Sequence, residues 1–156
     1  MAEKKEDQLR LPPHSLEAEQ AVLGCMLIDV EAVPKVIRHL AENSFYKPAH
    51  ATIFTHMMKL FEDNNTIDNI SMLEELKKSS QLDAVGGAYY ITGLSSEAPS
   101  AANVEYYARI VKDKAILRTI ISAAIEMSTT AYEGGDEAIE ILDNAEQVLF
   151  KLSEHA

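Results

Sequence analysis

The chain has 156 residues, 47% of them hydrophobic, and carries 25 acidic against 14 basic side chains, for a formal net charge of −11. This length suits one buried domain, or a small globular head with an appended hairpin, and we expect the second arrangement. No apolar run approaches the roughly 20 residues that span a bilayer. Nucleic-acid binding requires basic side chains that neutralise phosphates, and in this chain they are outnumbered by acidic ones. We therefore expect no membrane contact, weak or no direct nucleic-acid binding, and protein partners, basic ones above all.

Two features favour the cytoplasm. Residues 1–10 are charged and hold no apolar segment of the kind found in a secretion signal. The single cysteine, Cys25, lies in an apolar helical run, where we expect a buried structural thiol that forms no internal disulfide.

The first elements in chain order are an arm and a helix. Residues 1–11 are polar without periodicity and predict a flexible N-terminal arm. Ser15 is a good N-cap for a helix that runs to about Ile28, and Glu17 and Glu19 fall in its first turn, where the helix dipole favours acidic side chains. Gly24 costs about 1 kcal/mol of helix propensity in the middle of this helix, which indicates a close helix crossing.

Further short helices are predicted over 29–41, 50–63, 68–78 and 84–94, and together with the first they form a helical head over 12–98. We expect the loop aromatics Phe45 and Tyr46 to fill the core. In each of the pairs Tyr89-Tyr90 and Tyr106-Tyr107 we expect one buried and one partly exposed ring, and an exposed tyrosine can serve as a docking anchor. No alternating strand pattern is present, so the fold class is all-α.

Residues 99–154 predict a long antiparallel helical hairpin that reverses at Gly134-Gly135. One narrow apolar seam on its second helix requires a partner helix; it consists of Ala138, Leu142, Ala145, Leu149 and Leu152. The first helix carries two apolar rows, which together cover an arc of roughly 200°; they are Leu117, Ile121 and Ala124, and Ile116, Ile120, Ala123 and Met127.

One partner helix cannot cover so wide an arc. We expect the long helix to pack on its mate along one row and to offer the other row to a separate surface, such as a second copy of the chain. The sequence does not tell which row does which. The predicted oligomer interface consists of Ile116, Leu117, Ile120, Ile121, Ala124, Leu142 and Leu149.

The residues predict no catalytic, cofactor-binding or metal-binding site. None of the five histidines belongs to a zinc motif, so we expect solvated or hydrogen-bonded imidazoles at His14, His39, His50, His56 and His155. Residues 63–74 fail as a calcium loop, because Ile67 replaces an oxygen ligand and Asp68 replaces the glycine of the sharp turn. A phosphate loop of the Gly-x-x-x-x-Gly-Lys-Ser/Thr type is also lacking.

Three ordered segments resemble the N-terminal domain of bacterial replicative DNA helicases of the DnaB family. They are residues 12–24 (PPHSLEAEQAVLG), 83–90 (DAVGGAYY) and 99–111 (PSAANVEYYARIV). The likeness covers about residues 11–154, and three motifs in order are much more specific than any one of them.

This resemblance implies a collar domain of the primosome, the assembly that primes DNA replication. In the family, hairpins pair between neighbouring subunits of a hexameric ring, often a trimer of dimers, and the collar recruits the C-terminal helicase-binding domain of primase. ATP and magnesium belong to a RecA-like C-terminal domain, which we expect to lie outside this chain. Family positions that matter for primase coupling align with Glu17, Tyr90, Ile121 and Met127, although the family residue type differs at Met127.

The leading hypothesis is thus a non-catalytic domain for helicase oligomerisation and primase binding. The alternative is a generic helical adaptor or dimerisation module unrelated to replication, and a helical metal-dependent enzyme is a third reading. The oligomeric state of the isolated domain, the ring symmetry and the binding of a helicase loader, a further candidate partner, stay open.

Overall fold

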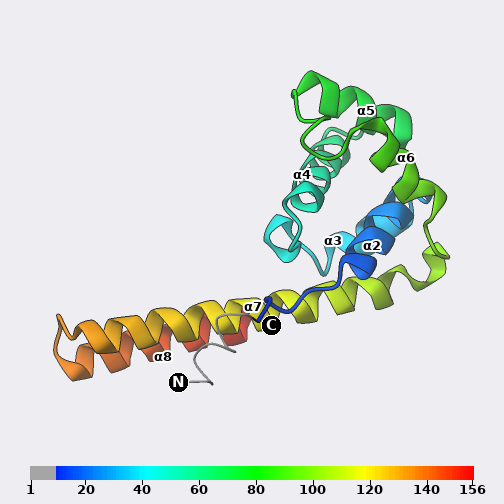
Figure 1. Cartoon of the computed structure of the whole chain (residues 1–156). Coiled ribbons are helices and arrows are strands. Elements are labelled where there is room, and N and C mark those ends of the chain that lie inside the picture. The colour runs from blue at the N-terminus through cyan, green and yellow to red at the C-terminus, as the bar shows by residue number, and fades with distance from the viewer. Residues whose placement is uncertain (1–9) are drawn as a thin grey trace. The chain divides into compact units, whose positions relative to one another are not determined.

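The computed structural model describes residues 10–156, so the arm predicted over 1–11 lies almost wholly outside the described residues. The prediction of an all-α fold is confirmed, since these residues form helices and no strand (Figure 1). The α-helices are α2 (Leu16–Ile28), α3 (Ala32–Ile37), α4 (Pro48–Glu62), α5 (Asn69–Lys78), α6 (Gly87–Ser96), α7 (Val104–Glu133) and α8 (Ala138–His155). Two short 3₁₀ helices, η1 (Glu42–Ser44) and η2 (Ala101–Asn103), complete the order. None of the described helices combines the length and the apolar character needed to cross a membrane.

The described residues divide into two compact units. The head unit spans residues 14–115, and the hairpin unit holds residues 10–13 and 116–156. The first part of α7 belongs to the head unit because Val104, Ala108 and Val111 are buried in its core. The boundary between residues 98 and 99, inferred from composition, stays a prediction.

Helix α2 forms as its sequence predicts. The Ser15 hydroxyl accepts a hydrogen bond from the Ala18 amide at 3.2 Å, which satisfies a free N–H group of the first turn. Gly24 lies at a close crossing with α6, since a Cβ atom at this position would lie 2.2 Å from the carbonyl oxygen of Leu94. Both predictions, the cap and the crossing, are confirmed.

The thiol of Cys25 is buried in the head unit, as predicted. Its sulfur lies 3.5 Å from the carbonyl oxygen of Pro99, to which the thiol donates. Burial raises the pKa of this thiol, and the nearby charge of Asp29 raises it further.

Two predicted helices differ at their ends from the structure. Helix α3 occupies only part of 29–41, because the amides of His39 and Leu40 both bond the carbonyl of Val36 and end the regular ladder. Helix α6 begins at Gly87 rather than near residue 84, because Gly86 adopts a left-handed backbone with φ of 106°. Asp68 caps helix α5 by accepting a hydrogen bond from the Ser71 amide at 2.8 Å.

The apolar side chains of α2, α4, α5 and α6 fill one core. Phe45 belongs to it, 5.0 Å from Phe54 between ring centroids, whereas Tyr46 is only half-buried and stacks on His14. The prediction that both loop aromatics fill the core is therefore confirmed for Phe45 and wrong for Tyr46. Each tyrosine pair has one more exposed ring, Tyr89 or Tyr106, but the other ring, Tyr90 or Tyr107, is half-buried against the core and not buried as predicted.

In the hairpin unit, Gly134 turns the chain with φ of 59° and its amide bonds the carbonyl of Thr130. The row of α8 that faces α7 overlaps the predicted seam in part, since it includes Ala145. A small cavity of about 60 Å³ between the helices is lined by Ala123, Glu126, Met127, Thr130, Ile141, Asn144, Ala145 and Val148. Ala145 and Leu152 of the predicted seam are half-buried, whereas Ala138, Leu142 and Leu149 are exposed. The half-buried residues Ile141, Ala145, Val148 and Leu152 also step by four and three and form the inward row.

Candidate functional site

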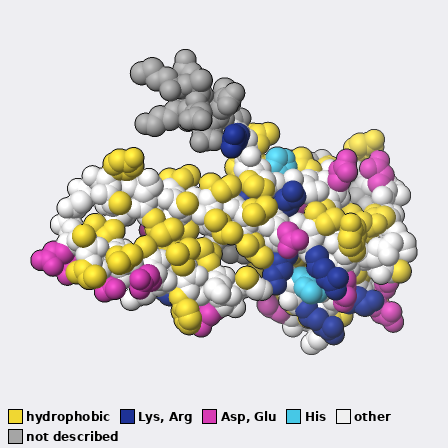
Figure 2. Space-filling view, turned by 90° about the horizontal axis from the view of Figure 1, so that it is seen from below, with side chains coloured by type: hydrophobic (Ala, Val, Ile, Leu, Met, Phe, Trp, Pro, Cys, Tyr) yellow, Lys and Arg dark blue, Asp and Glu magenta, His cyan; other side chains and the backbone are white. Residues whose placement is uncertain are grey.

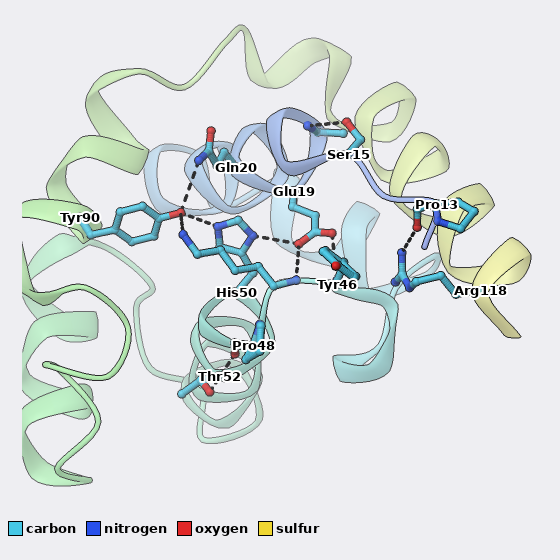
Figure 3. Close-up of polar contacts among 12 residues, drawn as sticks. Pro13, Ser15, Glu19, Gln20, Tyr46, Pro48, His50, Thr52, Tyr90 and Arg118 are labelled. Carbon is cyan, nitrogen blue, oxygen red and sulfur yellow. Dashed lines mark hydrogen bonds and ion pairs between the residues drawn. The ribbon is translucent and has the colours of Figure 1, made fainter. Parts of the chain in front are cut away.

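A buried polar network joins three helices of the head unit (Figure 3). Glu19 of α2 accepts from Nδ1 of His50 on α4 at 2.9 Å, and Nε2 of His50 contacts the hydroxyl of Tyr90 on α6. Glu19 is 1% exposed and His50 is fully buried, so neither exchanges its partners for water. Buried polar groups need hydrogen-bond partners. Here the partners are distant in sequence, since 31 residues separate Glu19 from His50 and 40 residues separate His50 from Tyr90.

The Glu19 carboxylate is ionised and accepts every bond it makes. Besides the imidazole of His50, the amides of Tyr46 and Lys47 donate to it at 2.9 and 3.3 Å. Burial alone would raise the pKa of Glu19, but the hydrogen bonds from His50 and from the two backbone amides outweigh it and hold the pKa below its ordinary value. A carboxylate has no proton to give, so Nδ1 of His50 carries one.

The Tyr90 hydroxyl points inward and contacts His50. Its oxygen accepts from two groups that can only donate there, the side-chain amide nitrogen of Gln20 at 3.4 Å and the ammonium of Lys47 at 3.3 Å. With the proton of Nδ1 on the bond to Glu19, Nε2 of His50 is the ring nitrogen that contacts the phenolic hydroxyl. Lys47 also lies 4.5 Å from the centre of the Tyr90 ring, as a cation–π contact.

Next to this network, a surface groove of about 680 Å³ lies between α2 and α6. We name it the α2–α6 groove; it is lined by Glu17, Gln20, Ala21, Tyr89, Tyr90, Thr92, Gly93, Leu94, Ser96, Glu97 and Pro99. Two of the four residues that the resemblance assigns to primase coupling, Glu17 and Tyr90, meet here. Tyr89 stands at its edge with 91% of its side chain exposed.

The other two residues of that set, Ile121 and Met127, belong to the hairpin unit. Ile121 is 44% exposed on α7, whereas Met127 is half-buried and lines the cavity against α8. The four residues are thus divided between the two units. The assignment of each to primase stays a prediction.

The hairpin unit exposes a broad apolar surface (Figure 2). Of the predicted interface residues, Leu117, Ile120 and Ile121 are 44 to 46% exposed, and Leu142 and Leu149 are each 52% exposed. Ala124 is exposed and Ile116 is half-buried. Further large apolar side chains of this unit that were not predicted for the interface are also exposed, namely Ile125, Tyr132, Ile139 and Phe150. Soluble monomers seldom expose so many large apolar side chains on two adjacent helices.

Acidic side chains border this apolar surface. Between residues 119 and 150 the chain has no lysine, arginine or histidine, and its seven acidic residues are Glu126, Glu133, Asp136, Glu137, Glu140, Asp143 and Glu146. All seven are exposed. Two copies that pair through the hairpin must therefore bring like charges together.

A second polar cluster, on α4 and α5, has a structural role. Glu75 accepts from Lys59 at 2.8 Å and contacts Nδ1 of His56 at 3.2 Å. The hydrogen bond from Lys59 lowers the pKa of Glu75, against the effect of burial. Within residues 10–156, no three His, Cys, Asp or Glu side chains come together in a way that could hold a metal ion.

The contact of Glu19, His50 and Tyr90 was not predicted from the sequence. Glu19 already had a local explanation as an acidic residue in a first helical turn. The histidine and the tyrosine are distant in sequence and belong to no spaced motif, so only the packing of the helices brings them together. The one available signal is that Glu19 falls among apolar neighbours on α2, with Ala18 and Val22 also buried.

Comparison with known proteins gives a consistent result. A family model for the DnaB-like helicase N terminal domain matches residues 11–113. Replicative DNA helicases DnaB of Rhodothermus marinus and Geobacillus stearothermophilus are 40% and 39% identical over 145 residues, which is 93% of this chain but only 15% and 32% of theirs. The crystal structure of the N-terminal domain of DnaB helicase from Mycobacterium tuberculosis matches with a TM-score of 0.85 and 36% identity, over 90% of this chain and 99% of that one.

Proposed function

Because the chain belongs to the family of DnaB-like helicase N-terminal domains, we propose that it is a non-catalytic collar domain of a replicative helicase, which associates with further copies of itself and recruits primase. The chain spans a third or less of the length of the curated helicases it matches. ATP hydrolysis and its magnesium ion are assigned by this proposal to the remainder of such a helicase. The cytoplasm is the compartment in which that helicase would work.

The exposed apolar surface of the hairpin carries the proposal. Burying a large aliphatic side chain contributes about 1.5–3 kcal/mol, and several that are half-exposed in a single copy can each gain part of that in an assembly. Leu117, Ile121 and Ala124 lie on one row of α7, and Leu142 and Leu149 lie on α8. A second hairpin placed along these rows buries them in a four-helix arrangement.

Solution mass tests self-association. Light scattering over a concentration series should show a mass above that of one chain for the wild type. Ile121→Asp places a charge on the apolar row and should shift the series toward the single chain. Ser122→Asp is the matched control, because it adds the same charge at the neighbouring exposed position outside the proposed interface. If both variants keep the wild-type mass at every concentration, the hairpin surface is not the interface.

Titration with the primase C-terminal domain tests recruitment. Tyr90→Ala should lower the affinity measured by calorimetry, because Tyr90 lines the α2–α6 groove. Circular dichroism checks that the variant remains folded. An affinity equal to that of the wild type removes Tyr90 from the docking site. A chain that dimerises and binds no primase would be a helical dimerisation module instead, which is the alternative function.

A further inference from the structure

The α2–α6 groove has a wall of hydrogen-bond acceptors. Two of its hydroxyl groups have their protons engaged by the backbone of α6. Thr92 donates to the carbonyls of Ala88 and Tyr89 at 3.0 and 3.1 Å, and Ser96 donates to the carbonyl of Gly93 at 3.2 Å. Both oxygens therefore have lone pairs and no free proton to offer a ligand.

Tyr90 also belongs to the wall of the groove, and its hydroxyl is turned into the buried network. It bonds Nε2 of His50, whose Nδ1 donates to Glu19, and its oxygen accepts from Gln20 and Lys47. Glu19 and His50 act here as positioning residues, because they touch no ligand and hold the hydroxyl of Tyr90 in this direction.

The groove also carries negative charge. Glu17 and Glu97 line it, and none of the described lining residues is a lysine or arginine. Lys47, bonded to Tyr90 outside the lining, offsets part of this charge. Glu97 caps the C-terminal end of α6, where the free carbonyls carry partial negative charge and where a cation is the stabilising partner.

The occupant that fits these groups is a planar cation rich in donors. A guanidinium group has five N–H donors, no acceptor and a constant positive charge, and it stacks on aromatic rings such as the exposed ring of Tyr89. We propose that the α2–α6 groove binds an arginine side chain carried by a protein partner. The volume of about 680 Å³ holds that side chain with a few flanking residues.

This inference names the chemistry of the docked partner and so rests on the proposed docking function. Three short capped peptides serve as probes: tri-arginine, tri-lysine, and tri-citrulline, in which a neutral urea group of the same shape replaces each guanidinium. Binding is measured on the full isotope-labelled chain by the amide signals of Gly93 and Glu97. Tri-arginine should cause saturable shifts, tri-lysine should bind more weakly, and tri-citrulline should cause none.

Matched variants locate the site. Glu97→Gln should weaken tri-arginine binding about three- to five-fold, as expected for the loss of one exposed ion pair. Glu62→Gln removes an exposed carboxylate at the end of α4, away from the groove, and should change nothing. Equal binding of tri-citrulline, or an equal effect of the two variants, overturns the proposal. Failure here with intact primase binding refutes only the arginine site, whereas absent primase binding refutes the docking function whatever the peptides do.

Discussion

The close crossing of α2 and α6 predicts a large effect of Gly24→Ala. A Cβ atom at this position would lie 2.2 Å from the Leu94 carbonyl oxygen and 2.9 Å from Cβ of Ala98, so the helices must separate by about 1 Å to restore normal contact. Overpacking of this kind costs about 1–3 kcal/mol, and the obstacle is backbone, which favours the upper value. The higher helix propensity of alanine offsets this cost by about 1 kcal/mol. The expected net loss of unfolding free energy is about 2 kcal/mol.

Urea unfolding followed by far-ultraviolet circular dichroism measures this loss. For a unit of about 100 residues the same change lowers the melting temperature by roughly 8–16 °C. Gly93→Ala is the control, because Gly93 lies inside α6 and a Cβ atom there meets no other atom within 4 Å. It should stabilise the protein by up to about 1 kcal/mol. If Gly24→Ala were as stable as the wild type, the steric argument for the crossing would be wrong.

Three further predictions concern the buried network and the hairpin. Tyr90→Phe removes the hydrogen-bond partner of buried Nε2 of His50 and should lower the unfolding free energy by about 1 kcal/mol in urea, whereas no change would mean that this hydrogen bond is not needed. The folded pKa of Glu19 is below 4.5, so its ionisation stabilises the fold above that pH, and the contribution is lost as the pH falls through the folded pKa. Unfolding free energies between about pH 5 and pH 3 should therefore fall less steeply in Glu19→Gln, and an identical slope would contradict the low pKa. Added salt should raise the dimer fraction in light scattering, because it screens the acidic side chains of the two hairpins, and a decrease with salt would show that ion pairs hold the copies together.

Local features of the fold were predictable from the sequence. The caps at Ser15 and Asp68 and the turn at Gly134 depend on a residue and its near neighbours, so the residue types are sufficient to place them. Gly24 could be recognised because a glycine inside a helix needs a packing reason. The helix ends were less accurate, since hydrogen bonds such as those to the Val36 carbonyl depend on the backbone path.

Features that depend on helix packing were not predictable. The sequence left open which apolar row of the hairpin is turned inward, because two overlapping rows of α8 have the same spacing, and only the crossing of the helices selects between them. The α2–α6 groove was not predictable either, since Glu17 in the first turn of α2 and Glu97 at the C-terminal end of α6 are far apart in sequence. Glu17 and Tyr90 came from a family resemblance, and Glu97 came from the structure alone.

The buried position of Cys25 makes the chain suitable for measuring conformational opening. A thiol reagent can reach this sulfur only in molecules where α2 has moved away from the segment around Pro99, and the raised pKa keeps the thiol unreactive until then. The rate of labelling thus reports how often this part of the head unit opens, without any change to the sequence. Cysteines introduced at exposed positions would react first, which allows fluorescent dyes to be attached one site at a time.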